Sequence, residues 1–113
     1  MSIDDARAAM SSSSRLASLW ELVRTIPFGR VASYGAVGRA LDRPVSGLLV
    51  GKWMTGAPAD VPWWRVVGAD GALPIARRGP EFALRQRTLL EAEGVRFEGD
   101  RVASGQHWSP DEL

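Results

Sequence analysis

The sequence predicts a mainly α-helical single domain with a small β element, in a winged-helix-like arrangement that includes a helix-turn-helix. Its 113 residues are enough for one domain with a modest core. Two short segments, residues 34–41 and 46–54, have apolar residues at helical spacing and are separated by about four turn residues. Apolar and charged residues alternate over residues 95–98. Gly99-Asp100 predicts a turn and residues 101–102 a returning strand, which is typical of a short hairpin.

The first expected helix covers residues 15–26, and Ser14 is available as its N-cap. Apolar residues on it follow the i, i+3, i+4, i+7 spacing of an amphipathic helix, at Leu16, Leu19, Trp20 and Val23. We assign Trp20 to the core. Residues 1–14 have acids near the start and no apolar stretch of signal-peptide type, so we expect a partly disordered lead-in. Pro27 ends the helix.

The next two expected helices form a helix-turn-helix candidate, in which the second helix is the element offered to a groove. Tyr34, Val37 and Leu41 share one face of the first helix, which follows a short β-leaning segment. Ser46 is a candidate N-cap for the second helix, and Trp53 on it is assigned to the core.

Gly47 and Gly51 lie four residues apart on the second helix and leave one face as bare backbone. This pattern has two interpretations. Either the face packs closely against another element, or it approaches a phosphate backbone closely.

The C-terminal half begins with an expected loop at residues 56–60. Residues 64–67 are apolar and β-branched, and Asp70-Gly71 predicts a turn. A helix is expected from Pro80 to Glu93, with Gly94 as its C-cap. Its inward residues are expected to be Phe82, Leu89 and Leu90.

The predicted organisation is a lead-in at residues 1–14, a DNA-binding domain at 15–102 and a loosely held tail at 103–113. The hairpin of residues 95–98 and 101–102 closes the domain. His107 is expected to be an uninvolved residue of the tail.

Composition excludes several classes of function. The chain has no cysteine and one histidine, so disulfides, cysteine-based metal sites and histidine relays are not expected, and neither is a cofactor. No apolar run approaches the ~18 residues of a membrane span. The absence of cysteine fits a cytoplasmic protein, nucleoid-associated if prokaryotic.

Net charge is +1, but its distribution is uneven. From Arg24 to Arg87 there are ten basic and four acidic residues, and from Thr88 onward there are two basic and six acidic residues. A basic body is compatible with a nucleic-acid face, and also with ordinary solvated arginines.

Four motifs, in order, resemble the O6-alkylguanine-DNA alkyltransferase family. Residues 26–35, Ile-Pro-Phe-Gly-Arg-Val-Ala-Ser-Tyr-Gly, look like the entry to its DNA-binding helix-turn-helix, and Pro44 and Val50-Gly51 keep its spacing. Residues 62–67, Pro-Trp-Trp-Arg-Val-Val, resemble its active-site motif Pro-Cys-His-Arg-Val. Residues 89–94 resemble its closing helix. The resemblance spans roughly residues 19–94.

Trp63 stands where the transferase has the cysteine that accepts the alkyl group. Indole is not a nucleophile, and no nucleophile–base pair occurs elsewhere, so no transfer or other enzymatic activity is expected. A tryptophan at this position is similar to the alkyltransferase-like branch of the family. The resemblance implies a non-enzymatic protein that binds O6-alkylguanine in duplex DNA, flips the nucleotide out and directs the lesion to nucleotide excision repair proteins. We expect a monomer.

Two departures from the family bear on this expectation. Trp64 replaces the family's histidine, which relays a proton with the glutamate that Glu93 matches. Leu48 falls where the family has an arginine that enters the base stack. A leucine wedge can unstack a base step, but it offers no hydrogen bond to the orphaned base. Leu48 at this position is either such a wedge or a core residue.

The resemblance assigns a lesion pocket to Tyr34, Trp63, Trp64 and Arg65, although Trp64 has an equally plausible place in the core and Arg65 a structural role. It assigns DNA binding to Tyr34, Ser33, Arg39, Arg43, Gly47, Leu48, Gly51 and Lys52. Arg77 and Arg78 either line the pocket rim or are solvated. No metal site is expected. The alternative is a helix-turn-helix that binds DNA or a partner without a lesion pocket, and both departures favour it.

Overall fold

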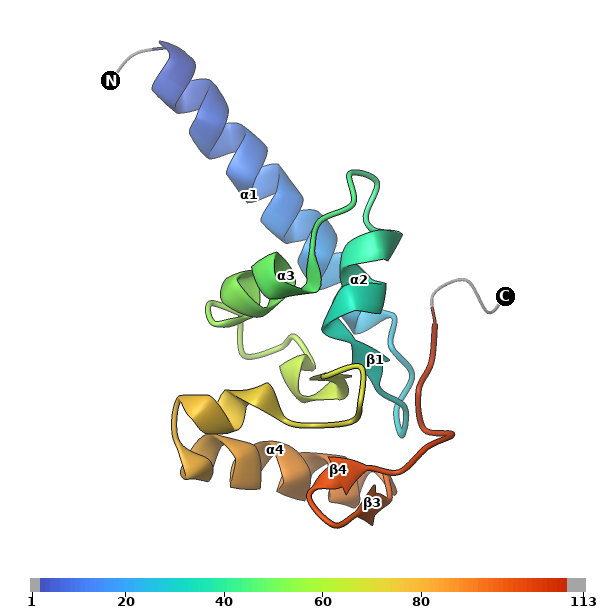
Figure 1. The fold of residues 1–113 in the computed structure, drawn as a ribbon. Coiled ribbons are helices and arrows are strands. Elements are labelled where there is room, and N and C mark those ends of the chain that lie inside the picture. The colour runs from blue at the N-terminus through green and yellow to red at the C-terminus, as the bar shows by residue number, and fades with distance from the viewer. Residues whose placement is uncertain (1–2, 110–113) are drawn as a thin grey trace.

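The computed structural model describes the backbone of residues 3–109 and the side chains from residue 14 to residue 109. The described part is mainly helical with two small two-stranded sheets, as predicted (Figure 1). Its elements in chain order are α1 (Ile3–Arg24), β1 (Ala32–Ser33), α2 (Tyr34–Ala40), α3 (Gly47–Met54), η1 (Trp63–Arg65), β2 (Val66–Val67), η2 (Pro74–Arg77), α4 (Pro80–Ala92), β3 (Phe97–Glu98) and β4 (Arg101–Val102), where η marks a 3-10 helix.

Helix α1 begins at Ile3, so the predicted start at Arg15 and the predicted disordered lead-in are wrong for residues 3–14. Several alanines, an arginine and a methionine precede the serine run and favour helix, and an existing helix extends at low cost. Ser14 is therefore not an N-cap. Its carbonyl accepts a hydrogen bond from the Ser18 hydroxyl at 3.1 Å, one turn further on. Figure 1 shows the N-terminal half of α1 extending away from the rest of the molecule.

Helices α2 and α3 form the predicted helix-turn-helix. Each begins after a serine N-cap: Ser33 accepts from the Ala36 N–H at 3.0 Å, and Ser46 accepts from the Leu49 N–H at 3.2 Å. The two helices cross closely, because a Cβ built on Gly47 would lie only 2.9 Å from the backbone nitrogen of Gly35. The packing interpretation of Gly47 is therefore confirmed.

Strands β1 and β2 pair in parallel, with Ala32 opposite Val66. Strands β3 and β4 form the predicted antiparallel hairpin. The sheets separate two groups of buried side chains. The larger joins α1, α2 and α3 and contains Leu19, Val23, Ile26, Ala32, Val37, Val50, Val61 and Val66, with Trp20 and Trp53 packed against it as predicted. The smaller joins the sheets to α4 and contains Val31, Val67, Leu90, Val95 and Val102.

Helix α4 ends at Ala92, one residue before the predicted end, and Gly94 follows with a positive φ of 86°. Leu90 is buried as expected, but Phe82 is 39% exposed and the inward position predicted for it is wrong. Phe82 lies on the first turn of α4, where the Arg78 guanidinium stacks over its ring at 5.6 Å. Gln86 fills the buried position one turn further on.

The segment after β4 is not loosely held. The Val31 N–H donates to the Gln106 carbonyl at 3.0 Å, and the Trp108 N–H donates to the Val31 carbonyl at 2.7 Å. The Trp108 ring packs against the larger core, and His107 forms a parallel bridge with Val31. The predicted loose tail is therefore wrong up to residue 109, because this segment pairs with Val31, the residue just before β1. The expectation that His107 has no part in function stays a prediction. Residues 110–113 lie outside the described part.

Candidate nucleic-acid interface

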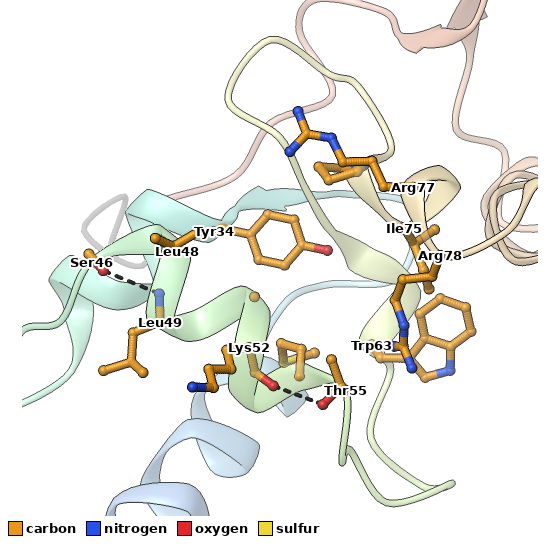
Figure 2. Close-up of a pocket in the computed structure, with 14 residues that line it drawn as sticks. Tyr34, Ser46, Leu48, Leu49, Lys52, Thr55, Trp63, Ile75, Arg77 and Arg78 are labelled. Carbon is orange, nitrogen blue, oxygen red and sulfur yellow. Dashed lines mark hydrogen bonds between the residues drawn. The ribbon is translucent and has the colours of Figure 1, made fainter.

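A cavity of about 870 Å³ lies between α3 and η2 (Figure 2). The start of α2 and the turn η1 also contribute to its walls. Its lining residues are Tyr34, Ser46, Gly47, Leu48, Leu49, Gly51, Lys52, Met54, Thr55, Trp63, Pro74, Ile75, Arg77 and Arg78. Of the predicted site residues, the structure thus brings Tyr34, Gly47, Leu48, Gly51, Lys52 and Trp63 together.

Tyr34 is half-buried, and its hydroxyl points into the cavity (Figure 2). Burial raises the pKa of Tyr34 above its ordinary value, so the hydroxyl is protonated at neutral pH and is a neutral hydrogen-bond donor. A Cβ on Gly51 would come within 3.9 Å of the tyrosine ring. This distance is an ordinary van der Waals contact, so the Tyr34 ring lies directly beside α3 at Gly51.

Trp63 lies in the wall of the cavity across from α3, and its ring is half-buried. The neighbouring Trp64 ring meets it edge to face, with 6.0 Å between the ring centroids and 86° between the planes. Because consecutive side chains of the short 3-10 turn point in different directions, only Trp63 reaches the cavity. Aromatic and aliphatic side chains dominate its walls, as they do in sites that accept flat organic groups.

Leu48 is 88% exposed at the first turn of α3 and lines the cavity mouth. The core interpretation of Leu48 is therefore wrong. The cap at Ser46 fixes the helix start, so the leucine is held on a defined helical turn rather than on a loop.

The charged residues of the cavity are all basic. Lys52 comes from α3, Arg77 from η2 and Arg78 from the residue that follows η2. No acid is among the described lining residues. Arg77 and Arg78 were left open between pocket rim and solvated surface, and the structure places both on the rim.

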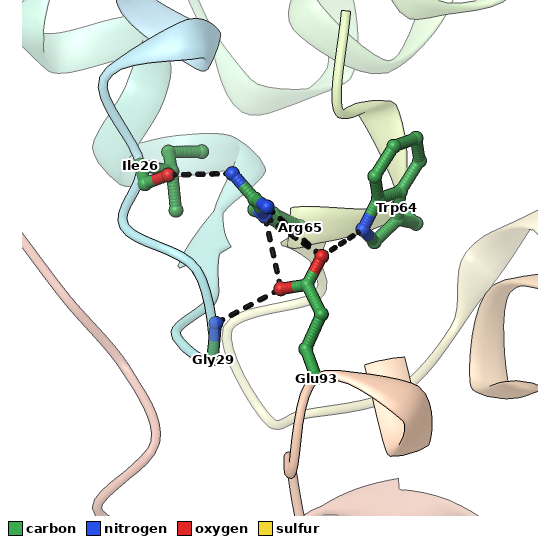
Figure 3. Close-up of polar contacts among 5 residues, drawn as sticks. All are labelled: Ile26, Gly29, Trp64, Arg65 and Glu93. Carbon is green, nitrogen blue, oxygen red and sulfur yellow. Dashed lines mark hydrogen bonds and ion pairs between the residues drawn. The ribbon is translucent and has the colours of Figure 1, made fainter. Parts of the chain in front are cut away.

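Trp64 and Arg65, which were predicted to share a lesion pocket with Tyr34 and Trp63, do not line this cavity. Trp64 packs against the smaller core, and its indole N–H donates to Glu93 Oε2 at 2.7 Å. The Arg65 guanidinium donates to Glu93 Oε2 at 2.9 Å and to the Ile26 carbonyl at 3.0 Å (Figure 3). Both side chains hold the turn η1 against the rest of the domain, which confirms the structural role considered for Arg65.

Glu93 accepts hydrogen bonds from Trp64, Arg65 and the Gly29 N–H, and its side chain is only 6% exposed. Burial is the largest influence on the pKa of Glu93 and raises it, but the hydrogen bonds from Arg65, Gly29 and Trp64 outweigh burial. The pKa of Glu93 is therefore below its ordinary value, and the carboxylate is ionised at neutral pH. The indole N–H of Trp64 takes the place of a relay partner and turns this glutamate into a structural anchor.

Gln86 is a site residue that the sequence did not reveal. It is 1% exposed, and its Nε2 donates at 3.0 Å to the carbonyls of both Trp64 and Val66. These carbonyls lie on either side of the last residue of η1. Gln86 and Glu93, both from the α4 segment, thus hold the turn that carries Trp63.

The remaining predicted DNA-binding residues lie outside the cavity. Ser33 is the N-cap of α2, and Arg39 is exposed on α2 with its guanidinium near Gly35. Arg43 is exposed in the turn between the helices and borders a separate hollow of about 240 Å³ next to α1. DNA contact by Ser33, Arg39 and Arg43 stays a prediction.

Among the described residues, none of the helices combines the length and the apolar character of a membrane span. No group of three or more histidine, cysteine or acidic side chains is placed there to hold a metal ion.

The fold and the site together define a helix-turn-helix domain of the DNA-binding class, with an aromatic cavity beside its second helix. Comparison with known proteins gives the particular family. Residues 16–95 match the family described as 6-O-methylguanine DNA methyltransferase, DNA binding domain. The chain is 34% identical to alkyltransferase-like protein 1 of Schizosaccharomyces pombe, over 68% of this chain and 72% of that protein. The chain therefore belongs to this family, in its alkyltransferase-like branch.

Two further likenesses agree with that assignment. The chain is 36% identical to the DNA base-flipping protein of Escherichia coli over 72% of its own length, and spans 62% of that relative. Its structure is similar to that of S. pombe Atl1 in complex with damaged DNA containing O6-carboxymethylguanine, with a TM-score of 0.74 and 26% identity, over 87% of this chain and 97% of that chain.

In this family, a cysteine in the Pro-Cys-His-Arg-Val motif is the residue that accepts the alkyl group. The acceptor position of the motif holds Trp63, and no residue of the chain supplies a thiol in its place. The chain thus matches the DNA-binding domain of the alkyltransferases, and Trp63 stands at the position of the cysteine that accepts the alkyl group.

Proposed function

We propose that this protein recognises O6-alkylguanine in double-stranded DNA by taking the damaged nucleotide into the cavity between Tyr34 and Trp63, without chemical change. The observation that carries the proposal is this cavity, which opens beside the exposed Leu48 on the second helix of the helix-turn-helix. Its volume of about 870 Å³ is within the roughly 300–1,000 Å³ of ordinary small-molecule sites.

The energetics favour a damaged base over an intact one. Extruding a nucleotide costs a few kcal/mol, least when its pairing is already weakened. Stacking of a base on an aromatic side chain such as Trp63 returns about 1–3 kcal/mol. Burying the Leu48 side chain between bases returns about 1.5–3 kcal/mol at most. The free energies of stacking and of burying Leu48 are together similar to the cost of extruding a nucleotide. A modest weakening of the base pair by O6-alkylation therefore decides whether the nucleotide remains in the cavity.

Basic groups hold the duplex in position. Lys52, Arg77 and Arg78 surround the cavity mouth, where a flipped nucleotide brings its own phosphate. Ser33, Arg39 and Arg43 are proposed to contact the phosphate backbone along α2 and the turn. Tyr34 donates its hydroxyl to the flipped nucleotide or to the phosphate that rotates with it. Gly47 and Gly51 line the cavity and are proposed to contact the DNA through their backbone.

The relatives support this proposal by their descriptions, because one is a base-flipping protein and another binds damaged DNA. We further propose that the bound, unrepaired lesion is handed to nucleotide excision repair proteins, and that the protein acts as a cytoplasmic, nucleoid-associated monomer. The lack of an acceptor thiol fits a role of marking damage for another system.

The test is a fluorescence-anisotropy titration of two duplexes that differ only in one O6-methyl group on a central guanine. We expect the lesion duplex to bind at least about tenfold more tightly, which corresponds to ~1.4 kcal/mol of weakened pairing. Both affinities should fall as salt rises, since phosphate contacts are shared. Equal affinities would favour the alternative, a helix-turn-helix that binds DNA without reading the lesion.

A further inference from the structure

Leu48 is the most exposed of the large hydrophobic side chains in the described part of the chain, at 88%. It lies on the first turn of α3 and borders the cavity mouth. If a nucleotide leaves the duplex for this cavity, the side chain next to the vacated place is Leu48. A leucine has no donor or acceptor, so it fills that place by shape alone.

The neighbours of Leu48 on α3 and its cap carry no planar, directional donor. The Ser46 hydroxyl oxygen is engaged with the Leu49 N–H at 3.2 Å as the helix cap. Gly47 has no side chain and is packed against Gly35. Lys52, one turn along, is a flexible point charge that lacks the planar, directional donors needed to tell one base from another.

We propose that this protein does not read the base opposite the lesion. It then binds O6-alkylguanine paired with cytosine, as the lesion forms, and O6-alkylguanine paired with thymine, as replication leaves it, through the same contacts. The inference rests on the function proposed above and extends its substrate class to both kinds of damaged pair. The apolar wedge stabilises either opened duplex equally, so the only remaining difference is the cost of opening each pair.

The test combines two lesion duplexes, with cytosine or thymine opposite O6-methylguanine, and their unmodified G·C twin. Melting of the free duplexes gives the difference in pairing strength, which is subtracted from the difference in binding. Leu48→Arg puts a planar donor at the wedge position. Leu84→Arg is the matched control, because Leu84 is a 66% exposed leucine on α4 that does not line the cavity.

For the native protein we expect the corrected dissociation constants for the two lesion duplexes to agree within about twofold, since no base-specific hydrogen bond distinguishes them. Leu48→Arg should favour cytosine over thymine by at least about fivefold, because adjacent N3 and O2 acceptors of cytosine fit a guanidinium. Leu84→Arg should keep the native ratio.

Two outcomes would overturn the inference alone: a corrected native preference above about fivefold, or a Leu48→Arg ratio equal to the native one. The second would show that residue 48 does not face the opposite base. If neither lesion duplex binds more tightly than the unmodified twin, the proposed function is wrong and this inference falls with it.

Discussion

Trp63 and Trp64 are adjacent in sequence but have different roles in the structure. Trp63 lines the cavity, whereas Trp64 packs in the smaller core and donates to Glu93. A reactive pair in the transferase motif is thus replaced here by one ring that lines the cavity and one ring that packs in the core. Tyr34 lines the same cavity from the start of α2.

Tyr34→Phe tests the hydroxyl that points into the cavity. We expect the lesion duplex to bind about 2- to 10-fold more weakly, the usual effect of losing one hydrogen bond, while the fold is kept because the ring remains. Tyr34 is the only tyrosine, so the ultraviolet signal of tyrosinate formation reports it alone, and its midpoint should lie above that of free tyrosine. Unchanged affinity for the lesion duplex would remove Tyr34 from the proposed contacts.

At the residue scale, sequence reasoning succeeded where a motif fixes identity and failed where packing fixes direction. The family resemblance singled out Trp63, Tyr34 and Leu48, and the structure places all three in the lining of one cavity. No pattern in Pro-Trp-Trp-Arg indicates which side chain of a three-residue 3-10 turn faces outward. Gln86 was missed because a glutamine on a helix ordinarily reads as a solvated residue.

At the element scale, α4 and its C-cap hold the turn η1 in place. Gln86 binds the carbonyls of Trp64 and Val66, and Glu93 binds the side chains of Trp64 and Arg65. The Arg65 side chain is 14% exposed and that of Glu93 6%, so this ion pair is shielded from screening by solvent.

Glu93→Gln removes the charge at the centre of this network and leaves Arg65 without its counter-ion. We expect the free energy of unfolding at neutral pH to fall by about 2–4 kcal/mol, somewhat below the range for a fully buried pair. The pKa of Glu93 is lowered in the folded state. Its stabilisation is therefore complete above the ordinary pKa of glutamate and is lost as pH falls through the folded-state pKa.

Chemical denaturation across acid to neutral pH checks this prediction. The gap between the native protein and Glu93→Gln should be widest at neutral pH and should narrow on acidification. Glu91→Gln is the control, because Glu91 forms an exposed i,i+4 pair with Arg87 and its loss should change stability by less than about 0.5 kcal/mol. A gap that stays constant with pH would show that the carboxylate charge is not the cause.

The elements themselves followed from local signals more often than not. Ser33 and Ser46 cap α2 and α3, and Gly94 ends the α4 segment, as their types suggest. The early start of α1 was missed because residues 3–14 contain only two large apolar residues, Ile3 and Met10, and end in a run of serines. The pairing of residues 106–108 with Val31 was missed because it joins positions more than 70 residues apart, which periodicity does not register.

At the scale of the whole molecule, the fold brings three features to one side of the helix-turn-helix. They are the cavity with its basic residues, the exposed Leu48 and the turn η1 that carries Trp63. The C-terminal segment pairs with Val31, just before β1, the strand that leads into Tyr34. The two small cores thereby hold both walls of the cavity on rigid elements. The family fold is kept, and the position of the alkyl-accepting cysteine holds a tryptophan that lines the cavity.

The most direct test of this account is the ratio of affinities for lesion and unmodified duplex, measured for the native protein and for Trp63→Ala. We predict that Trp63→Ala loses most of the preference while its affinity for unmodified DNA stays within about twofold, because phosphate contacts do not involve the indole. Trp108→Ala, which removes a ring packed on the larger core, should lower stability but keep the ratio. A Trp63→Ala protein that is folded and keeps the native lesion preference would contradict the account.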